Sequence, residues 1–436
     1  MNKLCVIGLG YIGLPTAVMF AKHGKEVIGV DINDNIVSAI NNKELYIDEP
    51  DLYDSYVEVL NTGKLKASNI PQKADAFIIS VPTPYTEKKE CDLRFVISAT
   101  KSILPFLDKG NLVILESTVG PKTTVDVLSN IIESAGFEVG KDIYLAHCPE
   151  RVLPGKIMYE LINNNRIIGG INDISTQKAA DLYGTFVKGE LLLTDATTAE
   201  MSKLMENTFR DVNIALANEL VKICEKLDID PYKVIELANK HPRVNIHQPG
   251  PGVGGHCLAI DPYFIIEKVP EEAKLISLAR KINNSMPDYV FNKIINIIGS
   301  IDNPKIAVFG ITYKGNTNDI RESPAIEIIK KLSNSKFNVE IFDPHVDIKD
   351  ICGYKLKNFD SVIEKADLLL ILADHNEFKN MDLDYIYRKM RTKIIFDTKN
   401  VIKDKEKFDG VLLKLGFNNF NKINVYEEIA STKENY

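Results

Sequence analysis

The feature that most constrains the fold lies within the first fifteen residues, where a glycine-rich turn follows an apolar run. Residues 3–7 read KLCVI, which is typical of a strand, and residues 8–13 read GLGYIG ahead of a helix-like stretch. In such a GxGxxG turn Gly8 permits a tight bend, Gly10 permits a ligand to approach the backbone, and Gly13 lets the helix pack on the strand. The sequence therefore predicts a parallel α/β sheet that starts at the first residues.

An acidic residue at the end of the next predicted strand suggests what this turn binds. Asp31 directly follows residues 27–30, about twenty residues beyond the glycines. An acid at this point accepts hydrogen bonds from ribose hydroxyls and repels a 2′-phosphate, while the helix N-terminus faces the phosphates of the ligand. These residues favour NAD over NADP. A glycine turn without a ligand is the alternative.

Composition excludes several classes of protein. A chain of 436 residues is too long to fold around a single hydrophobic core. Its composition, with 45% hydrophobic and 26% charged residues, is ordinary for globular domains. The net charge of -7 argues against a nucleic-acid partner, which requires clustered Lys and Arg. No apolar run reaches the roughly 18 residues of a membrane span. Dispersed cysteines without metal-ligand spacing indicate a reducing compartment. We expect a cytoplasmic protein without a bound metal or membrane contact.

The apolar pattern predicts three regions. Strand-like runs at residues 3–7, 27–30, 76–81, 112–115 and 143–146 indicate a Rossmann-like sheet within residues 1–195. Helical spacing at 197–227 and 271–299 indicates a central helical region, residues 196–300. Strand-like runs return at 305–309, 339–342, 368–372 and 394–396, within residues 301–436. The expected fold class is α/β, with two Rossmann-like doubly wound parallel-sheet domains joined by a central helical region.

A second candidate site is a loop that ends near a cysteine. Residues 248–262 read QPGPGVGGHCLAIDP, and this content of Gly and Pro excludes a regular helix or strand. Cys257 lies near the end of this loop, four residues before Asp261. A thiolate attacks carbonyl carbon readily, and backbone amides of a glycine-rich loop can stabilise it. An inert buried cysteine is the alternative.

Polar residues on a predicted helix extend this site. Lys203 and Asn207 lie one turn apart, and Arg210 continues the same stripe. An ammonium beside a carboxamide can hold a developing oxyanion, although a solvated helix face would look the same in the sequence. Three further polar segments, VPTP (81–84), ESTVGP (116–121) and HCPERVLPG (147–155), each follow a predicted strand, at the sheet edge where α/β proteins bind ligands. Each of these could also be an ordinary loop.

Seven motifs in the same order resemble the UDP-glucose/GDP-mannose dehydrogenase family over nearly the whole chain. They are GLGYIGLP, VPTP, ESTVGP, CPERVLPG, AEMSKLMENTFRDVNIALANE, GPGVGGHCLAIDP and GITYKGNTNDIRESPA. The resemblance implies NAD as cofactor, a UDP-sugar as substrate, and a homodimer or larger homo-oligomer formed through the central helices. Within this family, the resemblance of the CPER and HPRVN segments implies UDP-N-acetyl-D-mannosamine as the sugar nucleotide.

The resemblance also implies roles for individual residues. Cys257 would be the nucleophile, Lys203 and Asn207 would stabilise oxyanions or transfer protons, and Asp261 with Thr118 would position a water, with Glu150 assisting hydrolysis. The residues around NAD would be Gly8, Gly10, Tyr11, Ile12, Gly13, Asp31, Thr83, Thr118 and Arg321. Those holding the sugar nucleotide would be Arg151, Val152, Lys203, Asn207, Arg210, His241, Arg243, Gly254, Tyr313, Lys314 and Lys399, with Arg243 able to reach a neighbouring subunit.

The expected activity is a four-electron oxidation at C6 of UDP-N-acetyl-D-mannosamine to the uronate, through a thiohemiacetal and a thioester on Cys257. UDP-N-acetylglucosamine and UDP-glucose are alternative substrates of the same class. A two-electron hydroxyacid dehydrogenase is a rival reaction type, although it would need neither Cys257 nor a second sheet. A non-catalytic NAD sensor is a third possibility.

Overall fold

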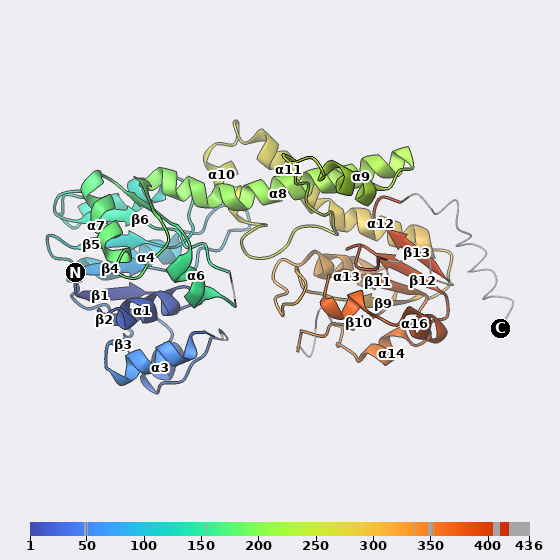
Figure 1. Cartoon of the computed structure of the whole chain (residues 1–436), viewed down its shortest axis with the longest axis horizontal. Helices are drawn as coiled ribbons and strands as arrows, with labels where there is room; N and C mark the ends of the chain where they lie inside the picture. Colours follow the sequence, from blue (N-terminus) through green and yellow to red (C-terminus); the bar gives the residue numbers. More distant parts are fainter. Residues whose placement is uncertain are drawn as a thin grey trace. The chain divides into compact units, whose positions relative to one another are not determined.

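The computed structural model describes residues 1–47, 49, 51–153, 155–335, 337–347, 351, 353–403 and 410–417. The chain divides into two compact units, which are treated one at a time below (Figure 1). The first unit comprises Met1–Glu206 and Tyr263–Glu272, and the second comprises Asn207–Pro262 and Ala273–Tyr436.

The first unit is built on an 8-stranded sheet in the order β3-β2-β1-β4-β5-β6-β7-β8. The strands are β1 (Lys3–Ile7), β2 (Glu26–Val30), β3 (Leu65–Ser68), β4 (Ala76–Ile79), β5 (Leu112–Leu115), β6 (Tyr144–His147), β7 (Arg166–Gly170) and β8 (Leu191–Asp195). The central strands are buried on both faces, which explains why AFII and LVIL read as unbroken apolar runs.

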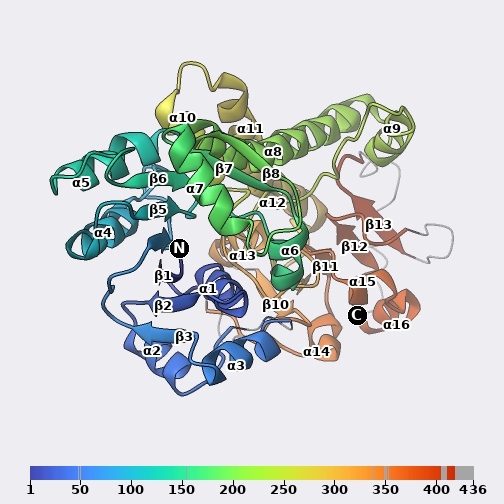
Figure 2. The same ribbon diagram turned by 60° about the vertical axis from the view of Figure 1, so that its left-hand side comes forward.

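Helices cover both faces of this sheet. Residues from α1 (Gly13–Lys22), α3 (Tyr53–Asn61), α6 (Ile157–Asn163) and α7 (Asp173–Tyr183) share one core with alternate residues of the strands. The other face packs against α4 (Arg94–Ile103) and a π-helical turn, Thr124–Leu128, that continues into α5 (Ser129–Glu133) (Figure 2). The short helices α2 (Asp34–Asn41) and Leu104–Phe106 also belong to this unit.

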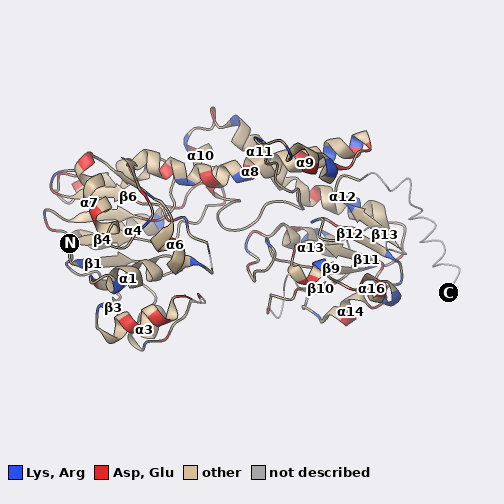
Figure 3. Cartoon of the chain, in the orientation of Figure 1, with Lys and Arg blue, Asp and Glu red and all other residues tan. Residues whose placement is uncertain are grey.

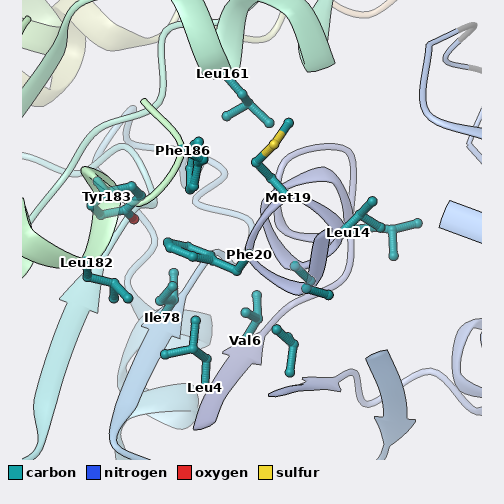
Figure 4. Packing of buried hydrophobic residues seen from close by; sticks show 14 of the residues in the cluster. Leu4, Val6, Leu14, Met19, Phe20, Ile78, Leu161, Leu182, Tyr183 and Phe186 are labelled. Carbon is teal, nitrogen blue, oxygen red and sulfur yellow. The ribbon is translucent and has the colours of Figure 1, made fainter. Parts of the chain in front are cut away.

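Aromatic packing fixes α1 against the sheet. Phe20 lies between the apolar side chains of the strands and the rings of Tyr183 and Phe186, with ring centroids 5.4 Å and 4.9 Å away (Figure 4). Because α1 directly follows the glycine turn, this packing also sets the position of that turn.

The long helix α8 (Ala196–Leu227) begins in the first unit and continues into the second. It is followed by α9 (Pro231–Ala238), α10 (Asp261–Lys268), α11 (Lys274–Asn284) and α12 (Met286–Ile298). No helix in the described part of the chain combines the length and the apolar character needed to cross a bilayer. Acidic and basic residues are interspersed along the described elements (Figure 3).

The second unit contains a 5-stranded sheet in the order β10-β9-β11-β12-β13, in which every neighbouring pair is parallel. The strands are β9 (Lys305–Phe309), β10 (Asn338–Phe342), β11 (Leu368–Ile371), β12 (Ile394–Asp397) and β13 (Val411–Lys414). Helices α12 and α13 (Pro324–Asn334) pack on one face, and α14 (Phe359–Ile363), α15 (Asn376–Lys379) and α16 (Leu383–Lys389) on the other. The predicted fold class is confirmed.

The structure corrects the predicted elements in three respects. The apolar pattern does not predict strands β3, β7, β8 and β13. Of these, β7 contains two glycines and β8 has exposed side chains, so neither reads as an apolar run. Strand β7 runs antiparallel to β6, whereas every other neighbouring pair of this sheet is parallel, as predicted. The helix predicted at 271–299 divides at Ser285, since Pro287 lacks an N–H and fits only the first turn of α12.

Candidate active site

The glycine turn between β1 and α1 has the geometry of a dinucleotide loop. Gly8 has φ +91°, and a Cβ there would lie 2.4 Å from the Ser80 carbonyl oxygen. A Cβ on Gly13 would lie 1.9 Å from the Gly8 oxygen, whereas a Cβ on Gly10 would meet nothing within 4 Å. Gly8 and Gly13 are therefore required by the fold itself, while Gly10 leaves an open backbone surface suited to a diphosphate.

The surroundings of this turn fit NAD. The Asp31 carboxylate accepts hydrogen bonds from the backbone N–H groups of Leu9 at 2.9 Å and Asn33 at 2.9 Å, and it stays half-exposed. No side chain in the described structure caps the N-terminus of α1, and its first turn carries no acidic residue. The positive end of the α1 dipole is thus available for phosphate, and Asp31 for ribose hydroxyls.

The loops after β4 and β5 are joined to each other. The Thr83 hydroxyl donates to the Thr118 carbonyl oxygen at 2.6 Å. The Ser117 hydroxyl donates to the Val81 carbonyl at 2.7 Å and accepts from the Val81 N–H at 2.9 Å. The VPTP and ESTVGP segments therefore form one structure at the carboxyl edge of the sheet, and this brings the predicted residues Thr83 and Thr118 together.

Glu150, in the loop after β6, belongs to a buried charged cluster. Its carboxylate pairs with the guanidinium of Arg166 and accepts from the Arg151 N–H at 2.8 Å. Arg166 also faces Glu116 at 3.5 Å, and the Tyr183 hydroxyl donates to Glu116 at 2.6 Å. The guanidinium lies 4.3 Å from the centroid of the Tyr183 ring. Two carboxylates thus share one guanidinium, which fixes how Glu150 is oriented.

The electrostatics of this cluster are dominated by burial. Loss of hydration raises the pKa of Glu116 to about 7, an effect opposed by the nearby Arg166 and reinforced by Glu150. When Glu116 is protonated near neutral pH, Glu150 is the carboxylate that pairs with the positive charge of Arg166.

Two further predicted residues of the first unit lie in this region. The Arg151 guanidinium forms an ion pair with Glu206 at 2.7 Å and donates to the Asn165 carbonyl oxygen. Val152 is half-buried in the same loop, and Lys203 is half-buried on α8.

The loop that carries Cys257 is locked by its glycines against the loop after β9. A Cβ on Gly254 would lie 2.4 Å from the Glu322 carbonyl oxygen, and one on Gly255 would lie 2.8 Å from the Tyr313 ring. The Gly255 N–H donates to the Arg321 carbonyl oxygen at 3.0 Å. This close backbone contact explains why the segment needs consecutive glycines.

Cys257 is a half-exposed cysteine whose backbone starts a helical turn. Its carbonyl oxygen accepts from the N–H groups of Ile260 at 3.0 Å and Asp261 at 2.9 Å. The Asp261 carboxylate accepts from the Asn207 amide, and the Asn207 oxygen in turn accepts from the Arg210 guanidinium. The structure thus brings four predicted residues of the second unit, Asn207, Arg210, Cys257 and Asp261, into one cluster.

A buried polar network holds α8 beside this loop. Asp211 pairs with Arg280 at 2.6 Å and accepts from the Asn283 amide at 2.8 Å. Asn218 donates to Asn283 at 2.9 Å and accepts from the Gly250 N–H at 2.9 Å. The Cys257 loop is therefore fixed at both ends, which favours a rigid nucleophile.

The loop between β9 and α13 supplies charge near Cys257. The Arg321 guanidinium donates to both oxygens of Asp319 at 2.6–3.1 Å, and His256 lies 4.0 Å from the same carboxylate. The hydrogen bond to Asp319 raises the pKa of Arg321, and the Cys257 thiolate adds to this effect. Burial raises the pKa of Tyr313, again with contributions from Asp319 and Cys257. Tyr313 and Arg321 therefore lie within electrostatic reach of the thiol.

The remaining predicted residues lie elsewhere in the second unit. His241 and Arg243 are exposed in the segment after α9, where the Arg243 N–H donates to His241 Nδ1 at 3.3 Å. Lys399 follows β12, lies 3.7 Å from Asp374, and lines a cavity of about 1420 Å³. Lys314 is exposed after β9.

Four residues that the structure connects to the predicted site were not predicted as site residues from the sequence. They are Arg166, Glu116, Tyr183 and, in the segment before α3, the buried Glu49. Each acts across a long sequence separation, so that only the ESTVGP motif, which contains Glu116, offered a signal.

The open dinucleotide loop of the first unit and the rigid cysteine loop of the second unit are features of an NAD-dependent dehydrogenase. The chain matches the UDP-glucose/GDP-mannose dehydrogenase family in its NAD binding domain over residues 2–187, its central domain over 197–285, and its UDP binding domain over 307–404. It belongs to this family, and NAD is its cofactor.

Individual relatives cover nearly the whole chain. A UDP-N-acetyl-D-mannosamine dehydrogenase of Methanococcus maripaludis is 50% identical over 92% of this chain and 94% of the relative. The solved UDP-N-acetyl-mannosamine dehydrogenase of Staphylococcus aureus is 55% identical, with a TM-score of 0.88 over 97% of this chain and 100% of that one. An NDP-N-acetyl-D-galactosaminuronic acid dehydrogenase of Ralstonia solanacearum is 44% identical, over 92% and 96%.

Proposed function

We propose that this enzyme oxidises UDP-N-acetyl-D-mannosamine at C6 to UDP-N-acetyl-D-mannosaminuronate, using two NAD per sugar and Cys257 as nucleophile. The observation that carries the proposal is the cluster around Cys257, in which Asp261 lies on the turn that begins at the cysteine and accepts a hydrogen bond from Asn207 of α8. A two-electron alcohol oxidation would need no such nucleophile.

Each step of the reaction balances with these groups. NAD, when bound, accepts two electrons as hydride in each of the two oxidations. The C6 alcohol first loses hydride and a proton to become an aldehyde. The Cys257 sulfur then adds to the aldehyde carbon and gives a thiohemiacetal, which loses a second hydride and a proton to become a thioester. Water cleaves the C–S bond, releases the carboxylic acid and restores the thiol.

The proposed roles of the neighbouring residues follow from their chemistry. Lys203 and the Asn207 amide would stabilise negative charge on the C6 oxygen, an effect of about 3–4 kcal/mol for a well-placed donor. Asp261 and Thr118 would orient the hydrolytic water, and Glu150, held by Arg166, would accept its proton.

The other proposed binding residues divide by ligand. For NAD we propose the glycine turn with Asp31, together with the residues Tyr11, Ile12, Thr83, Thr118 and Arg321. For the sugar nucleotide we propose Arg151, Val152, Arg210, His241, Arg243, Gly254, Tyr313, Lys314 and Lys399. The three proposed regions, 1–195, 196–300 and 301–436, are supported by the three separate family matches.

The choice of sugar rests on relatives rather than on geometry. The archaeal and staphylococcal proteins that bear the mannosamine name are 50% and 55% identical to this chain. The protein named for the galactosaminuronic acid is 44% identical, so other UDP-N-acetylhexosamines are the comparison that the assay must include.

The test is the number of NADH formed per limiting UDP-N-acetyl-D-mannosamine with excess NAD. We expect two NADH, with the glucosamine and galactosamine epimers and UDP-glucose turned over much more slowly. One NADH per sugar would contradict the covalent second oxidation, whereas two NADH from an epimer alone would contradict only the choice of sugar.

The variant Cys257→Ala tests the nucleophile. It should bind NADH with unchanged affinity and form no uronic acid, because no thioester can form. Cys224→Ala, which removes a buried cysteine of α8, is the matched control and should retain acid production. Normal acid formation by Cys257→Ala would exclude the proposed mechanism.

We propose further that the enzyme is a homodimer, or a larger homo-oligomer, formed through α8. Phe209, Leu216 and Ile223 recur at seven-residue spacing on this helix and are 60%, 52% and 46% exposed. Such an apolar stripe suits a second copy of the same helix. Leu216→Lys should convert the oligomer to monomer in light scattering, whereas an unchanged mass would exclude this interface.

The proposed location is the cytoplasm, where NAD is available and a thiol nucleophile stays reduced. A disulfide at Cys257 in protein isolated from cells under thiol-blocking conditions would contradict it.

A further inference from the structure

Glu49 connects two loops that the proposed function assigns to different ligands. It lies between α2 and α3 and is only 2% exposed. Its Oε2 accepts from the Tyr11 hydroxyl at 2.6 Å and from the Gly155 N–H at 2.9 Å, and its Oε1 accepts from the Ile157 N–H at 3.0 Å. A buried carboxylate is thus held by three donors that come from two distant segments of the chain.

One of these segments is the dinucleotide loop. Tyr11 stands between Gly10 and Gly13 of the glycine turn, and its side chain is 39% exposed. The segment before α3 makes a second hydrogen bond to the glycine turn, in which the Tyr46 hydroxyl donates to the Leu9 carbonyl oxygen. The position of the backbone that would face the diphosphate is therefore set partly by residues 46 and 49.

The other segment is the loop that follows Glu150. Gly155 has φ +87°, and Ile157 is the first residue of α6. The two N–H groups point at the same carboxylate, which fixes the end of the CPERVLPG segment that begins with Glu150, Arg151 and Val152. Movement of this loop therefore alters the geometry at Glu49, and through Glu49 at Tyr11.

We propose that Glu49 is a positioning residue that couples NAD binding to sugar-nucleotide binding, by joining the glycine turn to the CPERVLPG loop. This inference rests on the proposed function, which assigns the second loop to the sugar nucleotide. Ordering one loop with its ligand favours the ordered form of the other, so each ligand tightens the other by the same factor.

A purely local role predicts something different. If Glu49 only caps the N-terminus of α6, its loss lowers stability and weakens sugar binding without changing how far NADH improves that binding. The coupling factor separates the two roles, because it is a ratio from which uniform weakening cancels.

The experiment uses the full-length enzyme with NADH and UDP-N-acetyl-D-mannosamine, a pair that cannot react. Calorimetry gives the Kd of each ligand alone and with the other saturating. We expect a coupling factor of at least about 5 in the wild type, at the lower end of typical allosteric coupling. The factor should be the same in both directions.

Tyr11→Phe is the sharpest variant, since it removes one hydroxyl and leaves the bonds from Glu49 to Gly155 and Ile157 intact. Its coupling factor should fall towards one. Glu49→Gln should also reduce the factor, because a carboxamide accepts through only one oxygen. The double variant should lose no more than Tyr11→Phe alone. Asp51→Asn, an exposed acid in the same segment, is the control and should keep the wild-type factor.

The outcomes discriminate between the ideas. A wild-type factor of one, or an unchanged factor in Tyr11→Phe with a wild-type melting temperature, overturns the coupling role and leaves the proposed function standing. Failure of the wild type to bind UDP-N-acetyl-D-mannosamine with or without NADH overturns the proposed substrate, and the coupling role with it.

Discussion

The two sheets begin with the same turn and use it differently. In the first sheet, the Gly8 N–H donates to the Val30 carbonyl oxygen, and the Leu9 N–H donates to the Asp31 carboxylate at 2.9 Å. In the second sheet, the Gly310 N–H donates to the Phe342 carbonyl oxygen, and the Ile311 N–H donates to the Asp343 carboxylate at 2.8 Å. Each acid also accepts the N–H two residues ahead at 2.9 Å. The backbone of a dinucleotide turn is therefore present twice.

What differs is the access to the acid and to the helix. Asp31 is half-exposed, whereas Asp343 is buried and faces His375 Nε2 at 3.2 Å. Because His375 Nδ1 accepts from the Asn316 N–H at 2.9 Å, the ring proton lies on Nε2 and points at Asp343. The helix after the second turn starts only at Pro324, with Ser323 as its cap. A Rossmann-like turn thus binds a dinucleotide only where its acid and its helix end stay open.

The largest expected effect comes from substitution of the first glycine of each turn, Gly8 or Gly310. Gly8→Ala should weaken NADH binding at least about 100-fold, roughly 2.7 kcal/mol, since a Cβ 2.4 Å from the Ser80 oxygen displaces the turn. Gly310→Ala meets Ala373 at 2.5 Å and should lower the melting temperature while leaving NADH affinity unchanged. Fluorescence titration of NADH checks both, and equal losses of affinity would contradict the assignment of one turn to NAD.

The next effect concerns the two acids. Asp31→Asn should weaken NADH binding about tenfold, because a charged acceptor for the ribose hydroxyls is lost. It should also reduce the preference of the enzyme for NADH over NADPH. Asp343→Asn should leave both affinities as they are. A loss of NADH affinity in the second variant would show that the closed acid also contributes to cofactor binding.

Glu116 of the first unit and Asp343 of the second should contribute to stability with opposite dependence on pH. Burial raises the pKa of Glu116 to about 7, so this carboxyl binds more protons in the folded unit than in the unfolded chain between about pH 4.5 and 7. The contribution of Glu116 to stability therefore falls as pH rises through this range. Glu116→Gln should remove about 1–3 kcal/mol of this dependence in calorimetric scans at pH 5 and 8. An identical slope in the variant would exclude Glu116 as its source.

The smallest effect is expected at the closed acid. Burial opposes ionisation of Asp343, but hydrogen bonds from His375, Ile311 and His345 outweigh it and lower the pKa of the carboxyl. This contribution to stability is complete above the unfolded pKa near 4 and is lost as pH falls further. Asp343→Asn should therefore reduce the acid sensitivity of the second unit by about 1 kcal/mol or less. Denaturant titrations at pH 3 and 6 measure it, and an acid sensitivity equal to wild type would refute the assignment.

Local pattern predicted the central strands well and the peripheral ones poorly. Strands β1, β4 and β5 are continuous apolar runs because they are buried on both faces, and periodicity reveals them. Strand β8 lies at the sheet edge with Leu193 exposed, and β7 ends in two glycines that a Cβ would drive into β8 and α7, so neither has a strand-like sequence. Their position is set by neighbours that are remote in sequence.

The sequence by itself determined the family, the glycine turn with its acid, and the cysteine loop, because each requires particular residue types at short and fixed spacing. Only the tertiary structure decided that Asp31 is accessible and Asp343 is buried. It also decided that the Arg166 guanidinium pairs with both Glu150 and Glu116, and that Glu49 joins Tyr11 to the loop before α6. These contacts join residues separated by 16 to 106 positions. Burial and pairing over such separations depend on the packing of whole elements, and no local pattern records them.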